Sequence, residues 1–206
     1  MAIWAIVPVK PLRRGKSRLA GLLSEEQRTR LNRYLLEHTL TILNEITDIE
    51  HTLVVSRDPA ALALTRSMGG RTVLEDGAPQ FNTAIKRATI VAQAQGARAV
   101  LILPADLPLV EPSDLKMLLL QGNNPPVVVI APDRRLDGTN CLFVNPAGLI
   151  EYGYGPGSFH RHSTHATEAG ARLEVIHSDR FGLDLDLPED LEMVGGLKGL
   201  KGLKMV

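Results

Sequence analysis

Short runs rich in apolar residues alternate with amphipathic segments along most of the chain. The apolar runs are five to eight residues long and predict buried strands; they lie at 2–9, 51–56, 71–75, 99–104, 126–132, 140–146 and 172–177. The segments between them predict helices; these lie at 24–42, 58–70, 81–96, 111–122, 157–170 and 187–195. The alternation predicts an α/β fold, a mostly parallel central sheet with helices on both faces.

The pattern divides the chain into one domain, 1–194, and a short tail, 195–206. Within the domain, about 132–180 has two neighbouring strands and a polar helix, which predicts either a lid or an antiparallel edge over the sheet. The tail repeats Gly-Leu-Lys three times. Such a short repeat cannot bury a core, so we expect a flexible extension, with contact to a membrane surface as the alternative.

Composition narrows the class of partner. The 206 residues hold 23 lysines and arginines and 23 aspartates and glutamates, so the net charge is zero. Nucleic-acid binders usually carry a basic excess, which favours a small molecule over a nucleic-acid polymer. The lone cysteine, Cys141, lies in an apolar run and excludes an internal disulfide. With no long apolar span and no charged leader at its start, we expect no membrane contact and a cytoplasmic location.

A basic loop follows the first predicted strand, in the stretch "VPVKPLRRGKSRLA". Its Gly-Lys-Ser resembles the end of a phosphate-binding P-loop, but Lys10 stands where that motif needs its first glycine, and Pro8 and Pro11 stiffen the turn. A P-loop ATPase or kinase is therefore disfavoured. The loop carries five cations, Lys10, Arg13, Arg14, Lys16 and Arg18. At the carboxyl end of a strand they are placed either to bind a triphosphate or to form a solvated basic loop.

Three carboxylates occupy the ends of two later segments. Asp106 follows the central run in "LILPADLPLV", and Asp184 and Asp186 lie two apart in "GLDLDLPEDL", on one face if that stretch is extended. An isolated aspartate at such a place is usually a cap or a turn former. Three that converge can hold Mg²⁺, which prefers carboxylate and phosphate oxygens.

Together these segments resemble the nucleotidyltransferase superfamily with a glycosyltransferase-A-like, Rossmann-type fold. The motifs "VPVKPLRRGKSRLA", "LPADLPL", "DGTN", "YGPGSFHRH" and "LDLDLPEDL" resemble more closely the guanylyltransferase family of coenzyme F-420 biosynthesis, over about residues 2–194. The superfamily more often has threonine where this chain has Leu187. The resemblance implies transfer of GMP from GTP to the phosphate of a small phosphorylated carboxylate, 2-phospho-L-lactate or phosphoenolpyruvate, with release of pyrophosphate.

The resemblance also assigns residues. It implies that Mg²⁺ is held by Asp106, Asp184 and Asp186, with Asp186 slightly favoured over Asp184. GTP phosphates would be bound by Lys10, Lys16 and Arg18, of which Lys16 and Arg18 act in catalysis together with Asp106. Asn82 matches a nucleotide-binding position, although it could equally cap a helix.

The acceptor site implied by the resemblance consists of Thr139, Gly155 and Ser158, in the part of the chain predicted as a lid. A hydroxyl at the start of a helix also suits an anion, whereas the alternative is a plain glycine-rich turn. His162 matches the family motif and either orients this pocket or simply packs. The neighbouring histidines do not predict a metal site.

Two alternatives remain open at this point. One is another nucleotidyltransferase, a molybdopterin guanylyltransferase or a sugar-acid cytidylyltransferase, because nothing in the residues selects guanine. The other is a non-catalytic nucleotide-binding regulator, against which the three retained carboxylates argue. A homodimer is a possible assembly in either case.

Overall fold

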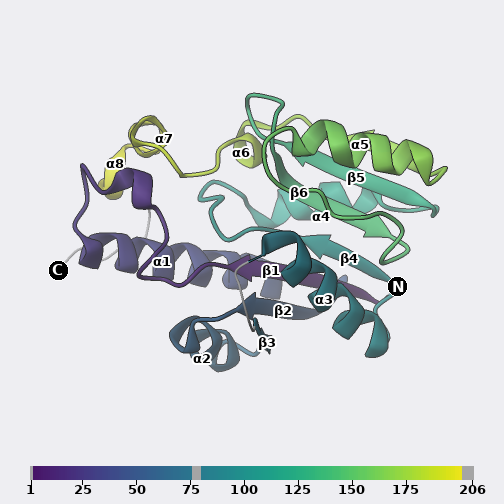
Figure 1. The fold of residues 1–206 in the computed structure, drawn as a ribbon, viewed down its shortest axis with the longest axis horizontal. Helices are drawn as coiled ribbons and strands as arrows, with labels where there is room; N and C mark the ends of the chain where they lie inside the picture. The colour runs from purple at the N-terminus through teal and green to yellow at the C-terminus, as the bar shows by residue number, and fades with distance from the viewer. Residues whose placement is uncertain (1, 76–79, 201–206) are drawn as a thin grey trace.

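The computed structural model describes residues 2–75 and 80–200. In this part of the chain seven strands form one sheet in the order β3-β2-β1-β4-β6-β5-β7 (Figure 1). The strands are β1 (Ile3–Val9), β2 (Ile49–Ser56), β3 (Arg71–Leu74), β4 (Ala99–Ile102), β5 (Val127–Pro132), β6 (Thr139–Asn145) and β7 (Arg172–Val175). Each apolar run in the sequence thus forms a strand, and the predicted α/β fold is confirmed.

Helices cover both faces of the sheet, as predicted. The helices are α1 (Glu25–Asn44), α2 (Pro59–Ser67), α3 (Phe81–Ala94), α4 (Pro112–Gln121), α5 (Ser158–Glu168), α6 (Asp179–Gly182), α7 (Pro188–Met193) and α8 (Gly196–Gly199). One apolar cluster joins a face of the sheet to α1, α2, α4 and α6, and a second joins the other face to α3 and α5. Successive side chains of β1 enter opposite clusters, Ala5 the first and Trp4 and Ile6 the second.

One strand, β6, runs against the rest. It is antiparallel to β4 and to β5, whereas the other strand pairs are parallel. The antiparallel strand expected between 132 and 180 therefore exists, but it lies inside the sheet and not at its edge. The physical reason is the apolar middle of β6, since Cys141 and Phe143 pack on one face of the sheet and Leu142 and Val144 on the other.

The start of the predicted tail is packed against the domain. Residues 196–199 form α8, and Leu200, only 5% exposed, joins an apolar cluster with Leu19, Leu31 and Leu185. In Figure 1, α7 and α8 lie beside the beginning of α1. Leu197 and Leu200 of the repeat therefore contact an apolar surface of the domain, and the flexibility of the tail stays a prediction. The remainder, 201–206, lies outside the described residues.

No helix in the described ranges has the length and hydropathy needed to cross a bilayer.

Candidate active site

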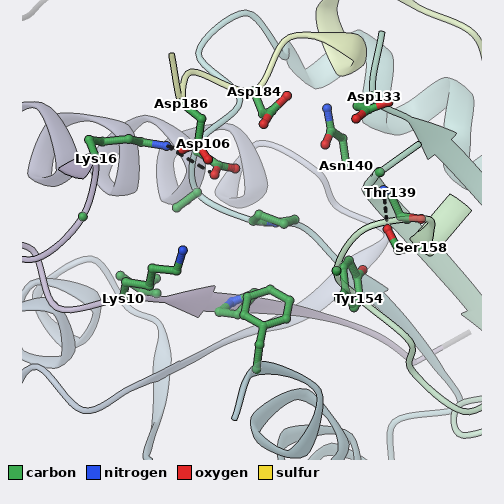
Figure 2. Close-up of a pocket in the computed structure, with 18 of the residues that line it drawn as sticks. Lys10, Lys16, Asp106, Asp133, Thr139, Asn140, Tyr154, Ser158, Asp184 and Asp186 are labelled. Carbon is green, nitrogen blue, oxygen red and sulfur yellow. Dashed lines mark hydrogen bonds and ion pairs between the residues drawn. The ribbon is translucent and has the colours of Figure 1, made fainter. Parts of the chain in front are cut away.

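A pocket of about 570 Å³ opens at the edge of the sheet where β1 and β4 end and β6 begins. Figure 2 shows Lys10 and Lys16 at one end of it and Thr139 and Ser158 at the other. Among the described residues, three cationic and five acidic side chains line it: Lys10, Lys16, Arg18, Asp106, Asp133, Asp137, Asp184 and Asp186. Its size falls within the range of small-molecule sites.

The basic loop is held in shape by neighbours far away in the sequence. The Leu12 amide donates to Asp58 Oδ2 at 2.7 Å, and the Leu12 carbonyl accepts from Asn32 Nδ2 at 2.7 Å. Gly15 packs directly against the side-chain amide of Asn32, since a Cβ at position 15 would lie 2.6 Å from Asn32 Nδ2. Lys16 then adopts a left-handed backbone conformation, with φ of 56°. The loop is therefore built in advance of any ligand, by side chains and not by the glycine-rich turn of a P-loop.

Lys16 joins the basic loop to both acidic motifs (Figure 2). Its Nζ donates to Asp186 Oδ1 at 2.9 Å and to Asp106 Oδ2 at 3.3 Å, and its side chain is only 6% exposed. Burial opposes the charge of Lys16, but the two carboxylates outweigh it and hold the lysine's pKa above its ordinary value. Burial likewise opposes ionisation of Asp186, yet Lys16 holds the pKa of that carboxyl below its usual range.

The other cations of the loop divide into two groups. Lys10 and Arg18 line the pocket, and Arg18 Nη1 lies 3.9 Å from Asp186 Oδ2. Arg13 and Arg14 are exposed and do not line it. A triphosphate in the pocket would therefore meet Lys10, Lys16 and Arg18, the three residues singled out from the sequence.

The acidic motifs meet through the backbone. The Leu185 amide donates to the carbonyl of Asp106 at 2.9 Å, which places Asp184 and Asp186 beside the end of β4. Asp184 and Asp186 do not follow a strand, because β7 ends at Val175 and α6 comes between. The segment is not extended at Leu185, because the Asp186 amide donates to the Asp184 carbonyl at 3.1 Å in a tight turn. Asp190 holds this turn, since its Oδ2 also accepts from the Asp186 amide at 2.9 Å.

The carboxylates suit a hard cation, although they do not form a finished cage. Burial, together with Asp106 and the other nearby carboxylates, raises the pKa of Asp184, a cost that a bound cation would relieve. No group of three or more ligating side chains is close enough to hold a metal within the ranges 2–75 and 80–200. Mg²⁺ commonly takes one or two carboxylates and completes its shell with substrate phosphates, so Asp106, Asp184 and Asp186 fit that ion in a substrate complex.

The predicted acceptor residues gather at the opposite end. Ser158 Oγ accepts from the Thr139 amide at 2.9 Å, and both residues line the pocket with Gly155. Gly155 has φ of 123°, a conformation that other residues rarely adopt. The start of α5 differs from expectation. The amides of Gly157 and Phe159 already donate to Asp137, so an anion would rely on the two hydroxyls and not on this helix terminus.

Asn82 lies in the first turn of α3 and does not line the pocket. Its Nδ2 donates to the Tyr154 carbonyl at 3.1 Å, and its Oδ1 accepts from the Tyr154 amide at 2.8 Å. Gln80 occupies the N-cap position of α3, without a capping hydrogen bond from its side chain, so Asn82 is not the capping residue. Its expected contact with nucleotide stays a prediction, and the geometry instead makes it a clamp on the 152–158 loop.

Sequence reasoning missed several residues that line the pocket. Asp133 precedes the Asp-Gly-Thr-Asn motif and Asn140 is its last residue, whereas Phe81 and Tyr154 make an edge-to-face contact with ring centroids 5.1 Å apart. Asn140 Nδ2 donates to the Phe181 carbonyl at 2.8 Å, which ties β6 to α6 beneath the acidic motif. The Asp-Gly-Thr-Asn motif was the sequence signal that could have led to these residues. It begins β6, the only antiparallel strand in the described sheet.

Comparisons with known proteins agree with the fold and the motifs. The family "Guanylyl transferase CofC like" matches residues 3–198. The chain is 39% identical to phosphoenolpyruvate guanylyltransferase of Rubrobacter xylanophilus over 96% of its length and 97% of that protein. It is 31% identical to 2-phospho-L-lactate guanylyltransferase of Methanocaldococcus vulcanius, over 90% and 81%.

Solved structures resemble the chain in fold at much lower identity. A nucleotidyl transferase from Methanothermobacter is 18% identical and superposes with a TM-score of 0.69, covering 94% of this chain and 95% of that one. The likeness supports the nucleotidyltransferase-like architecture alone. The family match spans nearly the whole chain, including the basic loop, the acidic motifs and the hydroxyl pair, and the chain therefore belongs to the CofC-like guanylyl transferase family.

Proposed function

We propose that this protein transfers GMP from GTP to the phosphate of phosphoenolpyruvate or 2-phospho-L-lactate and releases pyrophosphate. Membership of the CofC-like family and the activities named for its relatives support the reaction class. Phosphoenolpyruvate is the first acceptor to test, because the 39% identical relative carries that name. By the family resemblance, the product would enter coenzyme F-420 biosynthesis.

One observation carries the proposal: a single pocket has cations at one end and paired hydroxyls at the other (Figure 2). The cations, with Lys16 the most buried, suit a triphosphate. Thr139 and Ser158 suit the small anionic acceptor. The Asp106 and Asp186 carboxylates lie along the pocket between the two ends, where the α-phosphate would have to be.

The chain's own residues provide alignment and charge neutralisation. Lys10, Lys16 and Arg18 would bind the β- and γ-phosphates and stabilise the charge that grows on the departing pyrophosphate. Thr139 and Ser158 would hold the acceptor so that its phosphate oxygen faces the α-phosphorus of GTP. The new bond joins that oxygen to the α-phosphorus as the bond to the β-phosphate oxygen breaks. A phosphate dianion is itself nucleophilic, so the reaction needs no strong general base.

The charge of the pocket supports Mg²⁺ as the cofactor. Five aspartates against three cations leave the described lining negative, although both proposed substrates are anions. A divalent ion held by Asp106, Asp184 and Asp186 would supply the missing positive charge and neutralise charge on the substrate phosphates. A cytoplasmic location and a homodimer remain predictions from the sequence.

The test is pyrophosphate release with each nucleoside triphosphate, with and without each acceptor, in the presence of Mg²⁺. We expect release only with GTP together with phosphoenolpyruvate or 2-phospho-L-lactate, and loss of release in Asp106→Asn. Asp48→Asn is the matched control, because Asp48 lies in an exposed turn. Release with CTP instead, or full activity in Asp106→Asn, would overturn the assignment of the nucleotide or of the carboxylate.

A further inference from the structure

A buried histidine lies directly behind the proposed acceptor site. His162, on α5, is completely inaccessible, and both of its ring nitrogens have partners. The Gly153 amide lies 2.9 Å from Nε2, and Thr139 Oγ1 lies 2.9 Å from Nδ1. The ring of Tyr154 packs edge-on against the imidazole, with centroids 4.8 Å apart. The histidine thus connects the 152–158 loop to the first residue of β6.

These partners determine where the imidazole proton lies. A backbone amide can only donate, so Nε2 must accept and cannot carry hydrogen. The neutral ring then carries its proton on Nδ1 and donates it to Thr139 Oγ1. Burial, with His165 and Arg161 nearby, lowers the pKa of His162 to about 4, which keeps the ring neutral near pH 7.

The tautomer has a consequence for Thr139. Its Oγ1 accepts from His162, so its own hydroxyl hydrogen remains available for another partner. Thr139 lines the pocket, and Ser158 Oγ beside it also accepts a protein hydrogen bond, from the Thr139 amide. An anionic acceptor offers only lone pairs and therefore needs donors.

We propose that His162 is a positioning residue that turns the Thr139 hydroxyl into a donor aimed at the acceptor. The inference rests on the proposed function and adds to it the group that orients the acceptor ligand. Asn82 supports the arrangement from the other side, because it holds the Tyr154 backbone next to Gly153 through two hydrogen bonds.

Two substitutions test the two hydrogen bonds of the His162 imidazole separately. In His162→Asn the amide nitrogen takes the place of Nδ1 and can still donate to Thr139, whereas the contact with Gly153 is lost. In His162→Gln the amide oxygen takes the place of Nε2 and can still accept from Gly153, whereas the contact with Thr139 is lost. We expect His162→Gln to raise the acceptor KM roughly five- to tenfold, the value of one hydrogen bond, with the GTP KM unchanged. His162→Asn should stay close to wild type in both.

Two further variants make the test specific. His165→Gln is the matched control, because His165 lies on the same helix, forms a hydrogen bond with the Glu151 carbonyl and does not line the pocket. In a Thr139→Val background, His162→Gln should cause no additional change in acceptor KM, since the hydroxyl it orients is already gone. An equal effect of Asn and Gln, or an additive effect in the double variant, would assign His162 a packing role and overturn the inference.

The tautomer can be measured without any turnover. In protein with ¹⁵N-labelled histidine, long-range ¹H–¹⁵N spectra distinguish protonated from unprotonated ring nitrogens. We expect His162, assigned by its absence in His162→Asn, to show a protonated Nδ1 and an unprotonated Nε2. The reverse tautomer would overturn the inference whatever the KM measurements show. Wild-type protein that shows the expected tautomer but no pyrophosphate release would instead refute the proposed function.

Discussion

Replacing Lys16 by methionine tests the link between the basic loop and the acidic motifs most directly. Methionine keeps the apolar stem and removes the ammonium that lies 2.9 Å from Asp186 and 3.3 Å from Asp106. If Lys16 stabilises charge on the departing pyrophosphate, kcat should fall about 10²- to 10³-fold, or about 3–4 kcal/mol. The carboxylates are 32% and 38% exposed, so solvent screens them and the two lost pairs should cost only about 1–2 kcal/mol of stability. The melting temperature should fall by about 2–8 °C.

Pyrophosphate release under saturating GTP and acceptor measures the first effect, and thermal unfolding without ligands measures the second. A third measurement uses Mg²⁺ alone. Because Lys16 no longer occupies the space between Asp106 and Asp186, millimolar Mg²⁺ should raise the melting temperature of the variant more than that of wild type. Lys116→Met is the control, since Lys116 is exposed on α4 away from the pocket.

Two results would refute this reasoning. Activity within about threefold of wild type would show that the ammonium does not stabilise the transition state, since the expected loss is at least 10²-fold. An unchanged response to Mg²⁺ would show that the ammonium and the metal do not compete for the same carboxylates. The melting temperature of Lys16→Met shows whether the variant is folded at the assay temperature, and so separates a loss of catalysis from a loss of folded protein.

Three other substitutions test separate parts of the site. Asp184→Asn removes a carboxyl whose pKa is raised by burial and by Asp106, so it should stabilise the protein at pH 7 by about 0.5–2 kcal/mol. The gain in stability should vanish below the unfolded pKa of 3.8, because the carboxyl is then protonated in both the folded and the unfolded state. Pyrophosphate release should fall in the same variant. Gly15→Ala should displace Asn32 from the Leu12 carbonyl and lower the melting temperature by about 2–10 °C in a thermal scan, and an unchanged value would mean that the loop adjusts freely. Asn82→Ala should raise the acceptor KM by loosening the 152–158 loop, whereas a raised GTP KM would restore the direct nucleotide contact predicted from the sequence.

The sequence by itself determined the layered fold and the location of the chemistry. Apolar runs and helical segments alternate so regularly that the strands could be placed, because burial on a sheet imposes a local pattern. Polar motifs directly after the first and fourth strands had to meet at one edge, because parallel strands end there together. The motifs also pointed to Lys16, Asp106 and Asp186, which the structure joins by ion pairs.

The tertiary structure decided which partners those residues have. The place of β6 inside the sheet, the bond from the Leu185 amide to the Asp106 carbonyl, and the clamp between Asn82 and Tyr154 each join segments far apart in the chain. A local pattern shows which side of a segment is buried, but it does not encode which distant segment covers it. His162 illustrates the limit: its motif was visible in the sequence, whereas the direction of its proton depends on Gly153 and Thr139, which only the fold brings to the two sides of its ring.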